Sequence, residues 1–441
     1  MLDLITSSMI AAWLNIFGQP KQNLQPLQEF PWQNSVIFSL PTITQDPLTQ
    51  SIVKTYLQNL TTQGIKPEQQ GVWVQSDWTT LASNQGKMPL PAASLTKIAT
   101  TLTALHKWGA KHQFMTNIYG RGGVENGILT GDLIVEGSGD PLFVWEEAIA
   151  LGNTLNQLGI RQVQGNILVV NKFYMNFENK PEMAGELLKQ ALNQKLWQGE
   201  ATEQYLQMPP GTKQPEIAIA GKVKAIKKVP SDAELLITHQ SLPLAEILRQ
   251  MNIYSNNQMA QILADLAGGA NKVAQAAADI ASFPSTEIYL VNGSGLGEEN
   301  RISPRAICKM LMTIDRLLEK YSFSATDLFP TAGRDIVGTV KNRGLPTGTT
   351  IKTGTLDNVS ALAGVIPTEG LAGRSQRGKV YFTIINYGHQ IEYFRQQQDK
   401  LLNELVQTRE LIPNSLSLAQ ENHWYLGDPQ RNQTQLNSSK L

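Results

Sequence analysis

Three short polar motifs, far apart along the chain, constrain its fold more than any other feature. They are Ser94-Leu95-Thr96-Lys97, Ser255-Asn256-Asn257 and Lys352-Thr353-Gly354, the last continued by Thr355. If they form one site, the chain must return to the same place after 161 residues and again after 97 residues. The surrounding sequence predicts a helix for the first motif, a turn between two helices for the second and a strand for the third.

The first motif pairs a candidate nucleophile with a candidate base. Residues three apart share one face of a helix, so the Ser94 hydroxyl and the Lys97 amine can meet. A serine hydroxyl is a poor nucleophile until a base takes its proton. A lysine amine can be that base only if burial or a neighbouring cation lowers its pKa. Taken alone, this spacing is common, and a solvated serine–lysine pair is the alternative interpretation.

The second motif lies after a helix predicted to end at Met251 and before one predicted to begin near Gln258. There Ser255 would relay a proton to the leaving group, and Asn257 would bind a substrate amide or the lysine. The alternative is capping of the following helix, because Ser and Asn are preferred N-caps.

The third motif belongs to a predicted edge strand that can pair with an extended peptide. Lys352 would supply positive charge for a substrate carboxylate, and the hydroxyls of Thr353 and Thr355 would bind that carboxylate. Strand amides would complete an oxyanion hole. Gly354 would leave room for the ligand. The alternative is an exposed strand that ends in a turn.

In this order and in these settings, the three motifs are typical of β-lactam-recognising serine enzymes. The chain resembles the low-molecular-mass penicillin-binding proteins of serine peptidase family S13, which are D-alanyl-D-alanine carboxypeptidases and endopeptidases. The resemblance covers roughly residues 70–405 and includes the segments GILTGDLIVEGSGDPLF, NGSGLGEENRISP and PTAGRDIVGTVKNR.

The resemblance implies an α+β fold, in which a β-lactamase/transpeptidase-like domain of helices and a five-stranded antiparallel sheet carries a mostly β inserted domain. It implies Ser94 as the acylated nucleophile and Lys97 as its general base, with the backbone amides of Ser94 and Thr355 as the oxyanion hole. Ser255, Asn257 and Lys352 would complete the catalytic set, and Thr353, Gly354 and Thr355 would bind substrate.

The same resemblance implies peptidoglycan stem peptides and β-lactams as ligands, no cofactor or metal, and a periplasmic or cell-envelope location. Several positions depart from the family's usual pattern. Asn256, Asn292 and Asn171 stand where the family usually has Asp, and Gly297 stands where it usually has Ser. The inserted domain helps to hold the substrate's side chain in this family, so the side-chain preference stays open.

Changes in composition divide the chain into a helix and connector, a discontinuous main domain, an insert and a polar tail expected to be disordered. The predicted ranges are 1–35, then 36–112 with 236–411, then 113–235, and finally 412–441. Apolar residues recur at helical spacing over residues 2–18, which predicts an amphipathic helix that packs on the protein or makes peripheral contact with a membrane. This segment lacks the basic start of a secretory signal.

Other candidates carry less. Balanced charge, 37 basic against 37 acidic residues, gives no global field for nucleic acid. The single cysteine, Cys308, is expected to pack in the core. Asp140 precedes a proline and is best interpreted as part of a turn. Arg334 and Asp335 are expected to form structural hydrogen bonds, with carboxylate binding by Arg334 as the alternative.

Two other functions compete with a peptidase. A β-lactamase needs a dedicated deacylating base, and residues 257–352 contain no Glu-x-x-Leu-Asn segment. A catalytically idle peptidoglycan-binding scaffold is disfavoured because all three motifs are intact. The sequence leaves open the preference between carboxypeptidase and endopeptidase activity and the oligomeric state.

Overall fold

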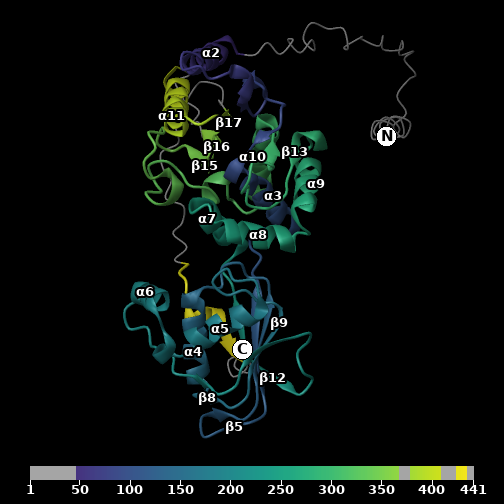
Figure 1. Cartoon of the computed structure of the whole chain (residues 1–441), viewed down its shortest axis with the longest axis vertical. Coiled ribbons are helices and arrows are strands. Elements are labelled where there is room, and N and C mark those ends of the chain that lie inside the picture. The colour runs from purple at the N-terminus through teal and green to yellow at the C-terminus, as the bar shows by residue number, and fades with distance from the viewer. Residues whose placement is uncertain (1–45, 367–377, 409–423, 435–441) are drawn as a thin grey trace, which may run out of the picture. The chain divides into compact units, whose positions relative to one another are not determined.

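The computed structural model describes residues 46–366, 378–408 and 424–434 (Figure 1). The helix predicted over residues 2–18 lies outside them, and so it stays a prediction together with its membrane contact. Within the described ranges, no helix has the length and apolar character needed to cross a membrane.

A five-stranded antiparallel sheet organises the main domain, in the order β15-β16-β17-β1-β2. Its strands are β1 (Gln70–Ser76), β2 (Thr80–Asn84), β15 (Thr350–Leu356), β16 (Val359–Ile366) and β17 (Val380–Tyr387). Strands from the two ends of the main domain meet where β1 pairs with β17. The predicted α+β class and five-stranded sheet are confirmed, and β15, which carries the third motif, is an edge strand.

Two helices, α2 (Pro47–Thr61) and α11 (Ile391–Thr408), pack against the sheet. Their shared core includes Leu60, Phe382 and Leu402. Helix α2 begins at Pro47 because the Asp46 side chain accepts the Thr49 N–H at 2.9 Å and the proline fits the first turn.

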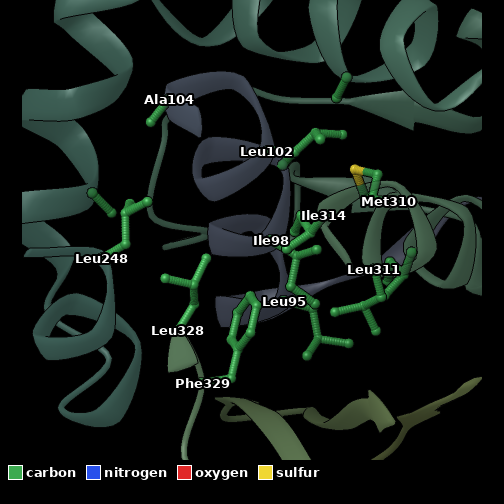
Figure 2. Close-up of a cluster of buried hydrophobic side chains, with 14 of the residues drawn as sticks. Leu95, Ile98, Leu102, Ala104, Leu248, Met310, Leu311, Ile314, Leu328 and Phe329 are labelled. Carbon is green, nitrogen blue, oxygen red and sulfur yellow. The ribbon is translucent and has the colours of Figure 1, made fainter. Parts of the chain in front are cut away.

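A second core holds the remaining helices of the main domain. They are α3 (Thr96–Trp108), α7 (Leu244–Ile253), α8 (Asn257–Leu266), α9 (Ala270–Ala281) and α10 (Pro304–Glu319). Every residue of α3 from Thr96 to Leu105 is buried. Figure 2 shows Ile98 and Leu102 of α3 beside Met310, Leu311 and Ile314 of α10. This packing fixes the position of the helix that carries Lys97.

Between α3 and α7 the chain builds most of a part with its own core and two further sheets, to which residues 432–434 add one strand. A six-stranded sheet has the order β11-β9-β7-β4-β12-β18, and a four-stranded one has the order β10-β8-β6-β5. The strands are β4 (Met115–Arg121), β5 (Val124–Glu125), β6 (Ile128–Leu129), β7 (Leu133–Ser138), β8 (Gln162–Val163), β9 (Ile167–Lys172), β10 (Ala218–Ile219), β11 (Val223–Ile226), β12 (Ala233–Gln240) and β18 (Asn432–Thr434).

This inserted part also contains three helices, α4 (Trp145–Gln157), α5 (Pro181–Ala191) and α6 (Gly199–Gln207). Strand β12 continues to Gln240, so the sheet extends beyond the end at residue 235 that the sequence predicts. The predicted boundary cuts this strand because residues 233–240 contain no turn residue that marks an end.

The prediction of a disordered tail over residues 412–441 is wrong for residues 424–434. Strand β18 pairs antiparallel with β12 and adds a strand to the sheet of the inserted part. Its order comes from polar contacts with buried partners rather than from apolar periodicity. We call the four side chains that make these contacts the anchor cluster: Glu147, His239, Arg431 and Asn432, all buried.

Candidate active site

The first motif lies at the start of α3. Ser94 is in a 3-10 turn, Ala93–Leu95, that leads directly into the helix, and its side chain is half-buried. Ala93 has a φ of 47°, in the left-handed region that non-glycine residues rarely adopt. Such strained backbone tends to gather at functional sites. The turn leaves Ser94 partly exposed, while Ala93 and Leu95 on either side are buried.

Lys97 is fully buried, and its amine has three polar neighbours. The Nζ atom lies 2.9 Å from Ser94 Oγ, 2.7 Å from Asn257 Oδ1 and 2.7 Å from the backbone oxygen of Ser294. Burial lowers the pKa of Lys97 to about 7. A neutral amine has two N–H donors and one lone pair. The two carbonyl oxygens can only accept, and therefore they take both N–H groups and leave the lone pair for the Ser94 O–H.

The second motif joins the site through its two outer residues. Ser255, between α7 and α8, has a φ of 52°, and its Oγ accepts a hydrogen bond from Lys352 Nζ at 2.9 Å. Asn256 caps α8, since its Oδ1 accepts the Met259 N–H at 2.9 Å. The capping interpretation therefore holds for the middle residue, and this cap turns Ser255 and Asn257 toward the two lysines.

Lys352 is the second fully buried lysine of the site. Its Nζ donates to Ser255 Oγ and to the backbone oxygen of Thr353, each at 2.9 Å. Burial lowers the pKa of Lys352 well below its usual value, and the positive charge of Lys97 lowers it further. Two neighbouring buried amines create a strongly positive pocket when either is protonated, which suits a substrate carboxylate.

Gly354 lies close to the chain's own backbone. A Cβ at this position would lie 3.0 Å from the Ala92 oxygen and 3.1 Å from the Ser94 nitrogen. A larger side chain would therefore crowd the turn that carries Ser94. Glycine lets β15 approach the turn that carries Ser94, and the approach brings the third motif to the candidate nucleophile. Thr353 is buried in this strand and Thr355 is exposed.

Sequence reasoning missed one functional group, the backbone oxygen of Ser294 that accepts from Lys97. Gly295 beside it has a φ of 85°, and a Cβ there would lie 1.8 Å from the Ala93 oxygen. Only glycine allows this loop to lie against the nucleophile turn. Asn292 holds the loop by accepting the Gly295 N–H at 2.7 Å. The Gly-Ser-Gly triplet at 293–295 was the available signal, because two glycines around a serine indicate a close backbone approach.

The other candidates serve structure. Burial raises the pKa of Cys308 to about 12, as expected for a core thiol. Asp140 accepts the Leu142 N–H at 2.8 Å in a turn of the inserted part. Arg334 donates to the Thr326 backbone oxygen, and Asp335 accepts from Arg249. In the part of the chain that the structure covers, no three His, Cys, Asp or Glu side chains are grouped to hold a metal ion.

Comparisons with known proteins identify the family of the chain. The sequence model of the D-Ala-D-Ala carboxypeptidase 3 (S13) family matches residues 53–196 and 211–407. D-alanyl-D-alanine carboxypeptidase DacB of Haemophilus influenzae is 24% identical over 431 residues, which cover 75% of this chain and 87% of that protein.

Two solved structures share the fold. A predatory peptidoglycan endopeptidase from Bdellovibrio bacteriovorus has 20% identity and a TM-score of 0.69, over 82% of this chain and 98% of its own. Penicillin binding protein 4 from Haemophilus influenzae, complexed with a β-lactam, has 21% identity and a TM-score of 0.59, over 79% of this chain and 99% of its own. With the family match extending over most of the sequence, the chain belongs to the D-Ala-D-Ala carboxypeptidase 3 (S13) family of serine-type carboxypeptidases.

Proposed function

We propose that this serine D-Ala-D-Ala carboxypeptidase/endopeptidase cleaves peptidoglycan stem peptides through an acyl-enzyme formed on Ser94. The observation that carries the proposal is the amine of Lys97. Its two N–H groups are held by carbonyl oxygens and its lone pair faces the Ser94 hydroxyl 2.9 Å away. A buried amine whose pKa lies near 7 is well matched to general-base catalysis at neutral pH.

In the acylation step, Ser94 Oγ attacks the carbonyl carbon of the penultimate D-alanine while Lys97 takes the hydroxyl proton. The amides of Ser94 and Thr355 stabilise the charge on the carbonyl oxygen. The C–N bond then breaks, and Ser255, hydrogen-bonded to Lys352, relays the proton that Lys97 took from Ser94 to the departing amine. In deacylation, Lys97 takes a proton from the water that attacks the ester carbonyl and returns it to Ser94 Oγ as the ester C–O bond breaks, which releases the carboxylic acid and restores both residues.

Lys352, Thr353 and Thr355 would bind the carboxylate beside the departing amine. The same positive pocket would accept the carboxylate of a β-lactam, and the β-lactam complex of the structurally similar penicillin binding protein 4 supports this ligand class. Work on peptidoglycan would place the protein in the cell envelope, with the periplasm as its proposed compartment. The match to a D-Ala-D-Ala carboxypeptidase family and the likeness to a peptidoglycan endopeptidase support this location.

Labelling with a fluorescent penicillin, combined with D-alanine release from a stem peptide, tests the proposal. The natural protein should form a long-lived adduct and release D-alanine, and Ser94→Ala should do neither. Ser83→Ala is the matched control, because Ser83 lies in β2, away from the three motifs. A natural protein that never labels would contradict the proposal, and rapid turnover of a chromogenic cephalosporin would indicate a β-lactamase instead.

A further inference from the structure

The guanidinium of Arg395 lies beside the third motif, although Arg395 is not part of any of the three motifs. Arg395 lies near the start of α11, and its Nη2 donates to Thr355 Oγ1 at 3.1 Å. Helix α11 packs against the sheet through the core of Leu60, Phe382 and Leu402, so its position relative to β15 is fixed. This contact adds a permanent positive charge at the exposed end of the strand that carries the candidate carboxylate-binding hydroxyls.

The direction of the hydrogen bond matters for the chemistry. A hydroxyl oxygen that accepts from a guanidinium keeps its own proton free to donate elsewhere. Arg395 has donors only, so it forces Thr355 to act as the acceptor in this contact. The Thr355 O–H is then available for an acceptor in the site, and a carboxylate is the acceptor that gains most from the adjacent positive charge.

The other partner of Arg395 is weakly held. Its Nη1 contacts Glu392 Oε1 at 2.5 Å, one helical turn away, and the Glu392 side chain is 76% exposed. Exposed ion pairs at this spacing contribute little to stability because solvent screens them. A substrate carboxylate can therefore take over part of the guanidinium without a large loss elsewhere. Glu392 therefore competes with the substrate carboxylate for the Arg395 guanidinium.

We propose that Arg395 is a specificity-determining residue that makes the enzyme prefer substrates with a free carboxylate on the departing residue. It does so by orienting the Thr355 hydroxyl and by supplying charge next to it. This inference rests on the proposed function, since it assigns the carboxylate of that same substrate to a named cation.

The test compares two forms of one stem peptide, one ending in D-Ala-D-Ala and one ending in its C-terminal amide. The measured quantity is the ratio of their kcat/KM values. In Arg395→Gln this acid-to-amide ratio should fall about tenfold, mainly through KM for the acid, because a charge-assisted hydrogen bond is lost. The amide should be cleaved as by the natural protein. Arg395→Lys should keep part of the preference, because it keeps the charge without the planar fork.

Two further variants separate recognition from structure. Glu392→Gln removes the competitor and should raise the ratio about twofold, as expected for a weak exposed pair. Lys400→Gln removes a cation from the same helix, where Lys400 pairs with Glu404, and should leave the ratio unchanged. Equal loss on acid and amide in Arg395→Gln would overturn the inference. A natural protein that cleaves neither peptide would overturn the proposed function instead.

Discussion

The protein buries ionisable groups in two places, and the two places handle the cost of burial in opposite ways. In the active site, Lys97 and Lys352 are fully buried, and among the described residues neither has a carboxylate within 4.0 Å. In the inserted part, Arg431 Nη2 donates to Glu147 Oε1 at 2.5 Å, and both side chains are almost completely buried. Two buried amines close together lower each other's pKa, which makes an amine reactive as a base. A buried pair of opposite charges instead holds two segments of the chain in place.

The anchor cluster is built around that pair. His239 Nδ1 lies 2.7 Å from Asn432 Oδ1, and burial together with Arg431 lowers the pKa of His239 to about 3. The imidazole is therefore neutral at physiological pH, and its Nδ1–H donates to Asn432. Arg431 also donates to the Gln240 backbone oxygen at 3.0 Å. Each of these contacts holds β18 against the sheet and none requires a substrate.

The largest effect is expected from removing the active-site amine. Lys97→Met keeps the length of the side chain but removes the base, so acylation by penicillin should slow by about 10²–10⁴-fold. The melting temperature should not fall, because the variant no longer buries an amine. Stopped-flow acylation and thermal unfolding measure the two quantities. Acylation at the natural rate would show that Lys97 is not the base.

The next largest effect is expected in the anchor cluster, on stability rather than on chemistry. Arg431→Ala leaves the Glu147 carboxylate buried without its partner and should cost about 3–5 kcal/mol of unfolding free energy. Urea denaturation followed by tryptophan fluorescence gives the value. The exposed pair of Arg121 and Asp232 provides the control, since Arg121→Gln should leave the unfolding free energy close to that of the natural protein.

A double change tests whether charge pairing is the cause. Glu147→Leu combined with Arg431→Met removes both charges and should recover most of the lost stability. Penicillin labelling per folded molecule should stay at the natural level in all these variants. If Arg431→Ala were as stable as the natural protein, the cluster would not anchor β18.

The smallest effect is a pair of pH dependences with opposite signs. Lys97 must be neutral to act as a base, so kcat/KM should fall about tenfold per pH unit below a pKa of about 7. Near the anchor cluster, burial raises the pKa of Asp140 to about 7. The folded state then binds more protons than the unfolded state between pH 4 and 7, and this group's contribution to stability declines as pH rises through that window.

Activity and unfolding free energy measured together from pH 5 to 7 check both signs. Asp140→Asn should flatten the stability curve relative to the natural protein and leave the activity curve in place. A variant whose activity curve moved with its stability curve would show that the two regions are coupled rather than independent.

Much of the main domain was accessible from sequence because its signals are local. The helical spacing of α3 and the strand pattern of the third motif are each encoded within a few residues. The order of the three motifs predicts that Lys97 and Lys352 lie near the serines of the first two motifs, but it gives no distances. Those distances depend on how the segments pack.

What could not be predicted depends on backbone atoms and on distant partners. The Ser294 oxygen that accepts from Lys97 has no side-chain signal of its own, since every residue carries a carbonyl, and the glycines on either side indicate only a close backbone approach without naming the partner. Only the structure shows that Gly354 lies against Ala92 and Ser94. Strand β18 escaped prediction because Arg431 finds Glu147 across 284 residues of sequence, far beyond any local pattern.

That separation also has a consequence for the order of events during synthesis. Translation delivers Arg431 about 190 residues after Gln240, the last residue of β12. At about 5–20 residues per second, the nascent inserted part waits about 10–40 s with the Glu147 carboxylate lacking its guanidinium. The sheet therefore acquires its final strand only after the main domain has been made, and a ribosome that stalls in between leaves a chain with an unsatisfied acid in its core.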